Sequence, residues 1–390
     1  MKMVLASYGT RGDVEPFAAV GRELLRRGHD VCMAVPPNMV GFLETVGFAA
    51  VAFGPEPLGP VRNWMIEDPA SAMATHIEYL SRAMEEWGTT LTALANGADL
   101  LLTGRIEQGL AANVAEYYGI PHAALHFFPG AHSRLSGWAG DTTEEAEDAQ
   151  RRELGLPEAT GPSTRSLAIQ AYDALCFPDL AAEWADGDGW QPFVGALTLE
   201  LPTEADDEVL SWIAEGTPPI YFGFGSGVWL PYAAQTFGLI SVACARLGER
   251  ALICSGASDF ADAPPSDQVK IVGAVNHSAV FPACRAVVHQ GGAGTTAAGM
   301  RAGVPALILW HPINDQQIWA DAVTRLKVGS GRAFSASNLG SLVADLRSIL
   351  DPQCITRARE VAAQMAKPAV SVATAADLLE DAVRLGHGSA

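Results

Sequence analysis

The stretch VVHQGGAGTTAAGMRAGVP, from Val287 to Pro305, decides the fold. An apolar, strand-like run ends at His289, and a turn with Gly291, Gly292 and Gly294 leads into a helix-like run at 294–302. Glycines let backbone amides approach a bulky anion, and a helix beginning near Thr295 offers unpaired N–H groups and its positive end. A tight turn that merely needs small residues is the plainer explanation. The added hydroxyls of Thr295 and Thr296 favour an anion site.

The same order of strand, turn and helix runs through both halves of the chain. Strand-like runs lie at 2–7, 30–35, 48–53, 100–103 and 122–127, and then at 220–224, 251–254, 269–272, 286–289 and 306–309. Helix-like runs lie at 15–27, 40–46, 71–95, 106–118, 233–247, 294–302, 339–350, 356–365 and 371–385. Fully apolar strands separated by helices predict parallel sheets covered on both faces. We expect an α/β chain of two Rossmann-like, doubly wound domains, with ligands in a cleft beyond the carboxyl ends of the strands.

Length and composition fit two globular domains. The chain has 390 residues, of which 49% are hydrophobic and 18% charged. A stretch rich in glycine, proline and acidic residues separates the two halves. We therefore expect an N-terminal domain at 1–190, a linker at 191–207 and a C-terminal domain at 208–370.

Charge and cysteine usage exclude some classes of partner. The net charge is −19, which argues against nucleic acid but leaves room for an anionic ligand held by backbone amides. The six cysteines are scattered without a CxxC pair, so we expect buried thiols in a reducing cytoplasm. The first apolar run is too short for a signal peptide, and no apolar segment approaches the length of a membrane span. The sequence predicts a cytoplasmic protein.

Two further stretches carry polar residues at strand ends. In LILWHPINDQQIWA, Asp315 and Gln316 suit the recognition of vicinal hydroxyls, although Asp315 is also a candidate N-cap for the helix that follows. In SYGTRGDVEP, Asp13 follows the first strand and is either a capping residue or a catalytic carboxylate at the rim of the cleft.

These motifs resemble those of family 1 glycosyltransferases with the GT-B fold. The resemblance is carried by H-x-G-G-x-G-T at 289–295, GVP at 303–305, Asp315-Gln316, and GTRGDVEP at 9–16. ASYGTRGDVEP, GHDVCMAVPPN and EDAQRRELGLP are similar to the actinobacterial branch that decorates natural products, including vancomycin-group and mycobacterial glycopeptidolipid glycosyltransferases. The resemblance covers nearly the whole chain. It implies a last helix at 371–390 that crosses back to the N-terminal domain.

The resemblance also assigns the residues of a donor site. His289, Gly291, Gly292, Gly294 and Thr295 would hold the diphosphate of a nucleotide sugar, with Ser226 from a facing loop. Asp315 and Gln316 would bind the sugar hydroxyls, and Val275 would contact the base through its backbone. Ser226 as a turn residue and Val275 as a core residue remain open alternatives.

One position departs from the pattern of UDP-sugar enzymes. Those relatives carry a glutamate that pairs with the ribose hydroxyls, and Ala297 stands at the aligned position here. Because alanine cannot hold a 2′-hydroxyl, the resemblance favours a TDP-linked sugar such as rhamnose or 6-deoxytalose. UDP-glucose remains the alternative donor.

The resemblance points to Asp13 as the base of an inverting transfer, with Arg11 at the diphosphate. No carboxylate cluster typical of Mg²⁺ sites is evident, so we expect a hexosyltransferase that needs neither metal nor cofactor. His126 is a reserve base or a packed core histidine, and His29 is most simply structural.

The acceptor pocket is expected in the N-terminal domain, in loops that contain Trp64, Phe127, Phe128 and Trp138. These loops suit a hydrophobic lipopeptide, aromatic or macrocyclic acceptor, and ordinary loop packing explains them equally well. We expect a monomer or homodimer, with peripheral contact to the inner membrane surface as an option. A non-hydrolysing nucleotide-sugar epimerase, a sugar-nucleotide binding module without turnover and an NAD-dependent enzyme are the competing hypotheses.

Overall fold

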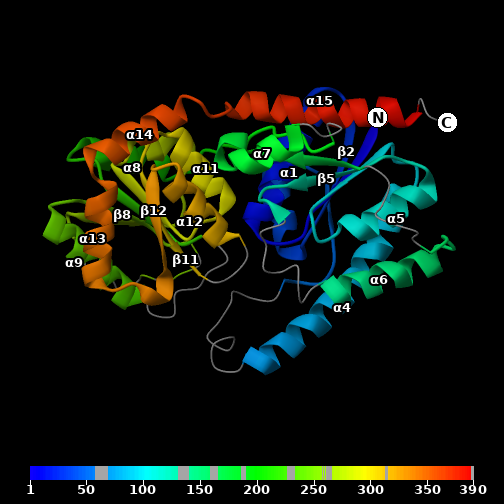
Figure 1. Ribbon diagram of the computed structural model, residues 1–390, viewed down its shortest axis with the longest axis horizontal. Helices are drawn as coiled ribbons and strands as arrows, with labels where there is room; N and C mark the ends of the chain where they lie inside the picture. Colours follow the sequence, from blue (N-terminus) through cyan, green and yellow to red (C-terminus); the bar gives the residue numbers. More distant parts are fainter. Residues whose placement is uncertain are drawn as a thin grey trace. The chain divides into compact units, whose positions relative to one another are not determined.

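The computed structural model describes residues 1–57, 69–130, 140–158, 166–185, 190–225, 233–256, 258, 260, 266–311 and 315–387. They form two compact units (Figure 1). The first contains the described residues up to Leu199 together with the chain from Ala366, and the second contains the described part of Glu200–Met365. Ser226, Trp64 and Trp138 lie outside the described residues.

The first unit is built on a six-stranded parallel sheet in the order β3-β2-β1-β4-β5-β6. Its strands are β1 (Lys2–Ala6), β2 (Asp30–Val35), β3 (Ala50–Ala52), β4 (Leu100–Thr103), β5 (His122–His126) and β6 (Leu167–Gln170). Its helices are α1 (Arg11–Arg26), α2 (Val40–Thr45), α4 (Pro69–Ala95), α5 (Gln108–Tyr118), α6 (Gly140–Glu153), α7 (Pro178–Ala185) and α15 (Pro368–His387). Short 3-10 turns lie at Pro37–Met39 and Ala174–Cys176.

The second unit repeats this architecture in the order β12-β11-β10-β7-β8-β9. Its strands are β7 (Ile220–Gly223), β8 (Ala251–Cys254), β9 (Val269–Val272), β10 (Ala286–His289), β11 (Ala306–Trp310) and β12 (Gly329–Ala333). Its helices are α8 (Asp206–Ala214), α9 (Ala233–Leu247), α10 (His277–Val280), α11 (Ala293–Arg301), α12 (Gln316–Arg325), α13 (Leu339–Ile349) and α14 (Pro352–Ala362), with 3-10 turns at Phe281–Ala283 and Phe334–Ala336.

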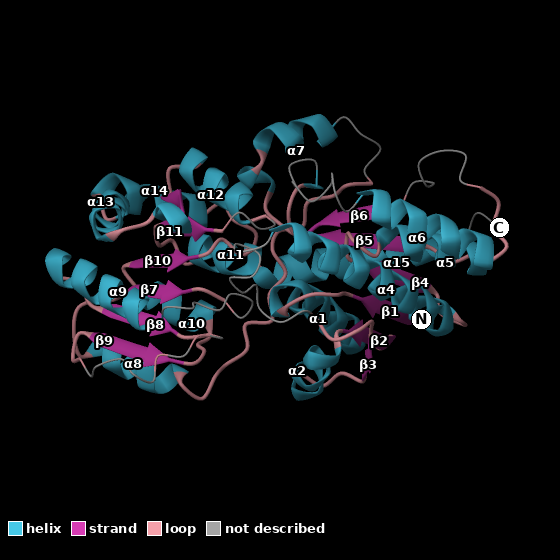
Figure 2. Cartoon of the chain, turned by 90° about the horizontal axis from the view of Figure 1, so that it is seen from below, coloured by secondary structure: helices cyan, strands magenta, loops and turns pink. Residues whose placement is uncertain are grey.

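Apolar side chains fill both faces of these sheets, as the continuous apolar strands predict. In the second unit, alternate residues of β7 divide between two cores. Phe222 packs with side chains of α9 and α13, whereas Tyr221 packs on the other face with Phe281 and Val304. Helices cover the two faces of each sheet (Figure 2). The expectation of two doubly wound parallel sheets is therefore confirmed.

The strand order places a topological switch point in each sheet. In the first unit it lies between β1 and β4, and in the second between β7 and β10. Ligands of open α/β sheets bind outside the carboxyl ends of the strands at such points. The turns that begin at Ser7 and at Gln290 each follow a strand at a switch point.

The sequence missed two strands for different physical reasons. β12, GSGRA, looks like a loop because it is rich in glycine. Both glycines are needed for close contact: a Cβ at Gly329 would overlap the carbonyl of Ala306 on β11, and one at Gly331 would overlap Ala320 of α12. β6, LAIQ, offers only three apolar residues before the polar Gln170. The chain from Trp190 to Val194 then runs beside β6, where Gln170 donates to Pro192.

The last helix, α15, belongs to the first unit, where it packs against α1. Arg27 at the end of α1 forms ion pairs with Asp377 (2.6 Å) and Glu380 (3.1 Å) of α15. His29 lies 2.6 Å from the same Glu380 carboxylate, which agrees with a structural role for His29. No helix in the described part of the chain has the length and apolar character needed to span a bilayer.

Candidate functional site

The buried histidine at the end of β10 has one ring nitrogen without a partner. His289 is fully buried, and its Nδ1 accepts a hydrogen bond from the backbone N–H of Gly291 (3.1 Å). Burial lowers the pKa of His289 to about 3, so the ring is neutral and carries its proton on Nε2. Among the residues that the structure describes, nothing accepts a hydrogen bond from this buried Nε2–H. Buried unpaired donors are rare, so His289 fits a site completed by a ligand oxygen.

Gly291 brings the glycine-rich turn against the start of α12. Its φ is +101°, a conformation that side chains rarely adopt. A Cβ at this position would lie 2.8 Å from the backbone oxygen of Gln316 and 2.9 Å from Cγ2 of Ile308. The glycine-rich turn and the start of α12 at Gln316, which are separated in sequence, are therefore in direct contact in the second unit.

The helix α11 begins at Ala293, earlier than the expected start near Thr295. Its first intrahelical hydrogen bond runs from the N–H of Thr296 to the carbonyl of Gly292 (2.9 Å). The N–H groups of Ala293, Gly294 and Thr295 thus have no helical partner. The expectation that Thr296 offers its hydroxyl to an anion is wrong, because its buried Oγ1 donates to the carbonyl of Gly292 (2.9 Å).

Asp315 and Gln316 lie where the sequence places them, at the start of α12. Asp315 is the N-cap residue but makes no side-chain cap bond, so this part of the capping hypothesis is wrong. Its Oδ2 instead accepts from Nε1 of Trp319 (2.8 Å). Gln316 is buried, and its Oε1 accepts from the backbone N–H of His311 (2.8 Å). Both side chains are thus held in place by residues of their own loop and helix.

Gln290 is a positioning residue that sequence reasoning missed. With its amide nitrogen turned toward the neighbouring carbonyls, it donates to Gly223 (3.2 Å) and Phe224 (3.3 Å). A Cβ at Gly225 would overlap this amide. Gln290 therefore ties the loop after β7 to the turn after β10 across the switch point. The only signal in sequence was its place between the strand-final histidine and the glycines.

Asp13 is part of a capping box at the start of α1. The helix begins at Arg11 with Thr10 as its N-cap, so Asp13 is not the N-cap that one hypothesis made it. Its Oδ2 accepts from the backbone N–H (2.6 Å) and Oγ1 (3.0 Å) of Thr10. A Cβ at Gly9, where φ is +140°, would overlap this carboxylate. Burial raises the pKa of Asp13, while the hydrogen bonds from Thr10 oppose that shift.

Near the half-buried Asp13 lies a fully buried carboxyl, Glu107, that the sequence analysis also missed. Glu107 follows β4 and is buried, and its Oε1 accepts from the backbone N–H of Tyr8 (3.1 Å). Burial, reinforced by the charge of Asp13, raises the pKa of Glu107 to about 8. Glu107 therefore carries a proton at neutral pH and links the turn after β4 to the turn after β1.

The remaining expected residues make contacts within their own units. Arg11 is exposed and forms an ion pair with Glu15 (2.9 Å), with its guanidinium 4.9 Å from the ring centre of Phe42. The side chain of Val275 is buried in the second-unit core, which leaves only its backbone for a ligand. Ser226 lies outside the described residues. Arg11 and Asp13 belong to the first unit, whereas the donor-site residues belong to the second.

His126 is a satisfied core histidine. Its Nε2 lies 3.0 Å from Oε1 of Gln108, and its Nδ1 lies 3.4 Å from Nε2 of Gln170. Burial, with the nearby Arg105 charge, lowers the pKa of His126 to about 3. With both nitrogens engaged, His126 has no free lone pair for a reserve base.

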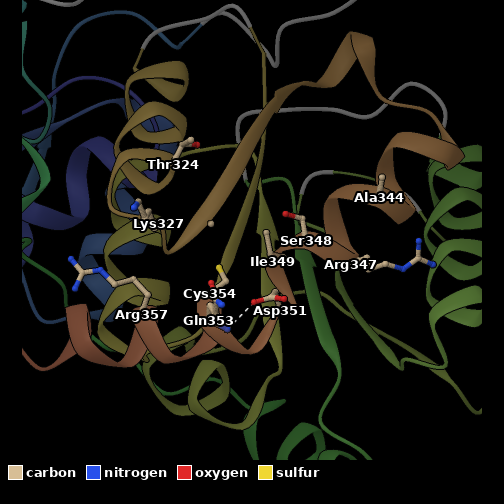
Figure 3. A pocket seen from close by; sticks show the side chains of 11 residues that line it. Thr324, Lys327, Ala344, Arg347, Ser348, Ile349, Asp351, Gln353, Cys354 and Arg357 are labelled. Atoms are coloured by element: carbon tan, nitrogen blue, oxygen red, sulfur yellow. Dashed lines mark hydrogen bonds between the residues drawn. The ribbon is translucent and has the colours of Figure 1, made fainter.

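The second unit also has a hollow of about 720 Å³ that is separate from the glycine-rich turn (Figure 3). It is formed where α12 ends, β12 begins at Gly329, and α13 gives way to α14, with Lys327 and Asp351 among its lining residues. This is the amino edge of the sheet, opposite the edge that carries the glycine-rich turn. None of the expected site residues lines it. In the described part of the chain, no group of three His, Cys, Asp or Glu residues is placed to hold a metal ion.

Both units thus place polar groups at the carboxyl edge of a doubly wound sheet, and the second combines unpaired amides with an unpartnered histidine donor. Comparison with known proteins identifies the class. The glycosyltransferase family 28 N-terminal domain matches residues 3–95, and the erythromycin biosynthesis protein CIII-like C-terminal domain matches residues 254–385.

Individual proteins match over the full length. An uncharacterized glycosyltransferase of Mycobacterium tuberculosis is 55% identical, across 98% of this chain and 99% of that protein. The vancomycin aglycone glucosyltransferase of Amycolatopsis orientalis is 28% identical, with 98% of each chain covered. The solved structure of glycosyltransferase VinC in complex with dTDP is similar with a TM-score of 0.69 and 17% identity, covering 99% of this chain and 100% of that one. The chain therefore belongs to the glycosyltransferases, with the GT-B fold that the sequence predicted.

Proposed function

We propose that this glycosyltransferase moves a 6-deoxyhexose from a TDP-sugar to a hydroxyl of a hydrophobic natural-product or lipopeptide acceptor, with inversion. The observation that carries the proposal is the anion site of the second unit. It combines the unpaired amides of Ala293, Gly294 and Thr295 with the unpartnered Nε2–H of His289. Neutral donors fixed at a helix N-terminus suit a diphosphate.

The choice of a TDP-sugar rests on Ala297. This residue of α11 is buried and has no polar side-chain atom for a ribose hydroxyl. VinC, whose fold is similar, was solved with dTDP. The sugar is assigned to Asp315 and Gln316, because Gly291 holds the start of their helix against the turn.

Asp13 is the proposed base. The acceptor hydroxyl gives its proton to the Asp13 carboxylate, the hydroxyl oxygen bonds to the anomeric carbon, and the bond from that carbon to the diphosphate breaks, releasing TDP. The raised pKa of Asp13 makes it a stronger base than an ordinary aspartate. The amides, His289 and Arg11 stabilise the leaving diphosphate, so the proposal includes no metal ion.

Isothermal titration with TDP, UDP and NAD tests the donor assignment. We expect TDP to bind tightest, and we expect the affinity to be unchanged by EDTA, because the proposed contacts are all protein donors. Tighter binding of NAD would contradict the proposal, and an EDTA-sensitive affinity would overturn its metal-free part.

Glucosyl transfer from UDP-glucose is the second candidate, because the vancomycin aglycone relative is a glucosyltransferase. Incubation with TDP-deoxyhexoses and UDP-glucose in parallel, with cell-envelope lipopeptide as acceptor, separates the two by mass. A gain of one deoxyhexose supports the first candidate, and a gain of one hexose supports the second.

A further inference from the structure

Arg105 is a guanidinium without a carboxylate partner at the carboxyl edge of the first sheet. It follows β4, at the switch point of that sheet. Within the described part of the chain it makes one hydrogen bond, a long one from Nη2 to the backbone oxygen of Phe128 (3.4 Å). Among the described residues, its buried Nε has no hydrogen-bond partner and no carboxylate forms an ion pair with the guanidinium. Desolvating a charge in this way is costly unless an anion completes the site.

The surroundings hold the guanidinium in a fixed place. Its central carbon lies 5.6 Å from the ring centre of Phe128. A Cβ at Gly130 would overlap the guanidinium, so only glycine lets the backbone pass at that point. Phe127 packs edge-on against Phe128, with ring centres 5.5 Å apart. Arg105, which follows β4, therefore lies beside the pair of aromatic rings on the loop after β5.

The charge of the site fits a monoanion. Arg105 is the cation of the cluster, because the neighbouring His126 is neutral with both nitrogens engaged. A single guanidinium balances one negative charge, and its planar fork matches the two oxygens of a carboxylate. The adjacent rings suit an apolar or aromatic body attached to that carboxylate.

We propose that Arg105 forms an acceptor subsite for a carboxylate, and that the preferred acceptors are hydroxyl-bearing, hydrophobic carboxylic acids. The proposal rests on the proposed function in so far as it takes the first unit to bind the acceptor. It adds a chemical feature of the acceptor, a carboxylate away from the reacting hydroxyl, to the hydrophobic character already expected.

The test compares 4-hydroxyphenylacetate with its amide, 4-hydroxyphenylacetamide, by isothermal titration of the full chain with and without saturating TDP. The wild-type protein should bind the acid about ten- to a hundredfold more tightly than the amide, because a hydrogen bond to a charged group is the difference between them. Arg105→Gln should remove this preference, and Arg105→Lys should retain only part of it. Arg152→Gln, an exposed arginine of α6, is the matched control and should keep the wild-type preference.

Three results would overturn the subsite: equal binding of acid and amide by the wild type, an unchanged preference in folded Arg105→Gln, or an equal loss in Arg152→Gln. If Arg105→Gln does not fold, as judged by its melting curve, an undiminished preference in Arg105→Lys overturns the proposal instead. TDP binding is recorded in the same titrations. Its absence from the wild type would contradict the proposed donor, whereas normal TDP binding without acid preference would contradict only the subsite.

Discussion

At Gly291 the backbone has a φ of +101° and passes so close to α12 that no side chain fits. The same residue donates its N–H to His289 and thereby fixes the proton of that ring on Nε2. One glycine thus sets the backbone turn, the contact with the proposed sugar-binding residues and the tautomer of the proposed diphosphate donor. At the scale of single residues, this is where fold and proposed chemistry depend on each other most.

We expect Gly291→Ala to lower the free energy of unfolding by about 1–3 kcal/mol, because alanine is strained at this φ. TDP binding should weaken in the same variant, since the contact with Gln316 must open. Gly294→Ala is the informative contrast, because a Cβ there meets nothing within 4 Å. It should weaken TDP binding without loss of stability. Chemical denaturation and titration calorimetry measure the two effects.

Gly238→Ala on α9 is the matched control, because its Cβ also enters open space and the residue lies outside the site. It should leave TDP affinity unchanged. Wild-type stability and affinity in Gly291→Ala would show that the turn does not depend on the glycine.

At the scale of elements, a hydrogen bond joins the turn after β1 to the turn after β4. The backbone N–H of Tyr8 donates to Glu107, and the Asp13 charge helps to raise the pKa of that glutamate. Two elements that are distant in sequence thus share one buried carboxyl beside the proposed base.

The pKa of Glu107 predicts how stability changes with pH. Because its folded-state pKa of about 8 is above its ordinary value of 4.5, the folded state binds the extra proton, and its contribution to stability is lost as pH rises through this window. Glu107→Gln stays neutral and keeps an acceptor for Tyr8. As pH rises from 4.5 to about 8, we expect the free energy of unfolding to fall less in this variant than in the wild type. Urea unfolding at several pH values measures the difference.

Glu44→Gln, an exposed glutamate of α2, serves as the control and should follow the wild-type curve. Parallel curves for wild type and Glu107→Gln would mean that Glu107 does not titrate as assigned. Asp13 has a pKa raised in the same direction, but it is present in all three proteins.

The strands with strong apolar runs and the glycine-rich turn could be predicted from sequence, because their signals are local. β12 could not, since its glycines are explained only by contacts with Ala306 and Ala320. Gln290 and Glu107 escaped for the same reason: each acts on a loop that follows another strand. Asp13 was found, but its place as the third residue of α1, where its carboxylate accepts from the backbone N–H of Thr10, is visible only in the structure.

For the whole molecule, the two units share one strand order and differ in what they place at the switch point. The first carries carboxyls and a lone guanidinium, and the second carries neutral N–H donors. This difference fits the proposed division of work, in which the first unit activates an acceptor and the second binds a nucleotide diphosphate. The chain also returns to the first unit through α15, which the ion pair between Arg27 and Glu380 holds against α1.

The most direct test of this division is Asp13→Asn, measured for transfer and for TDP binding in the same preparation. Asparagine keeps an oxygen for the Thr10 N–H but cannot take up the acceptor proton. Transfer from a TDP-deoxyhexose should fall by about 10²–10⁴-fold, while the dissociation constant for TDP stays at the wild-type value. The exposed Asp30→Asn should change neither. Unchanged turnover in Asp13→Asn, or loss of TDP binding together with turnover, would contradict the account.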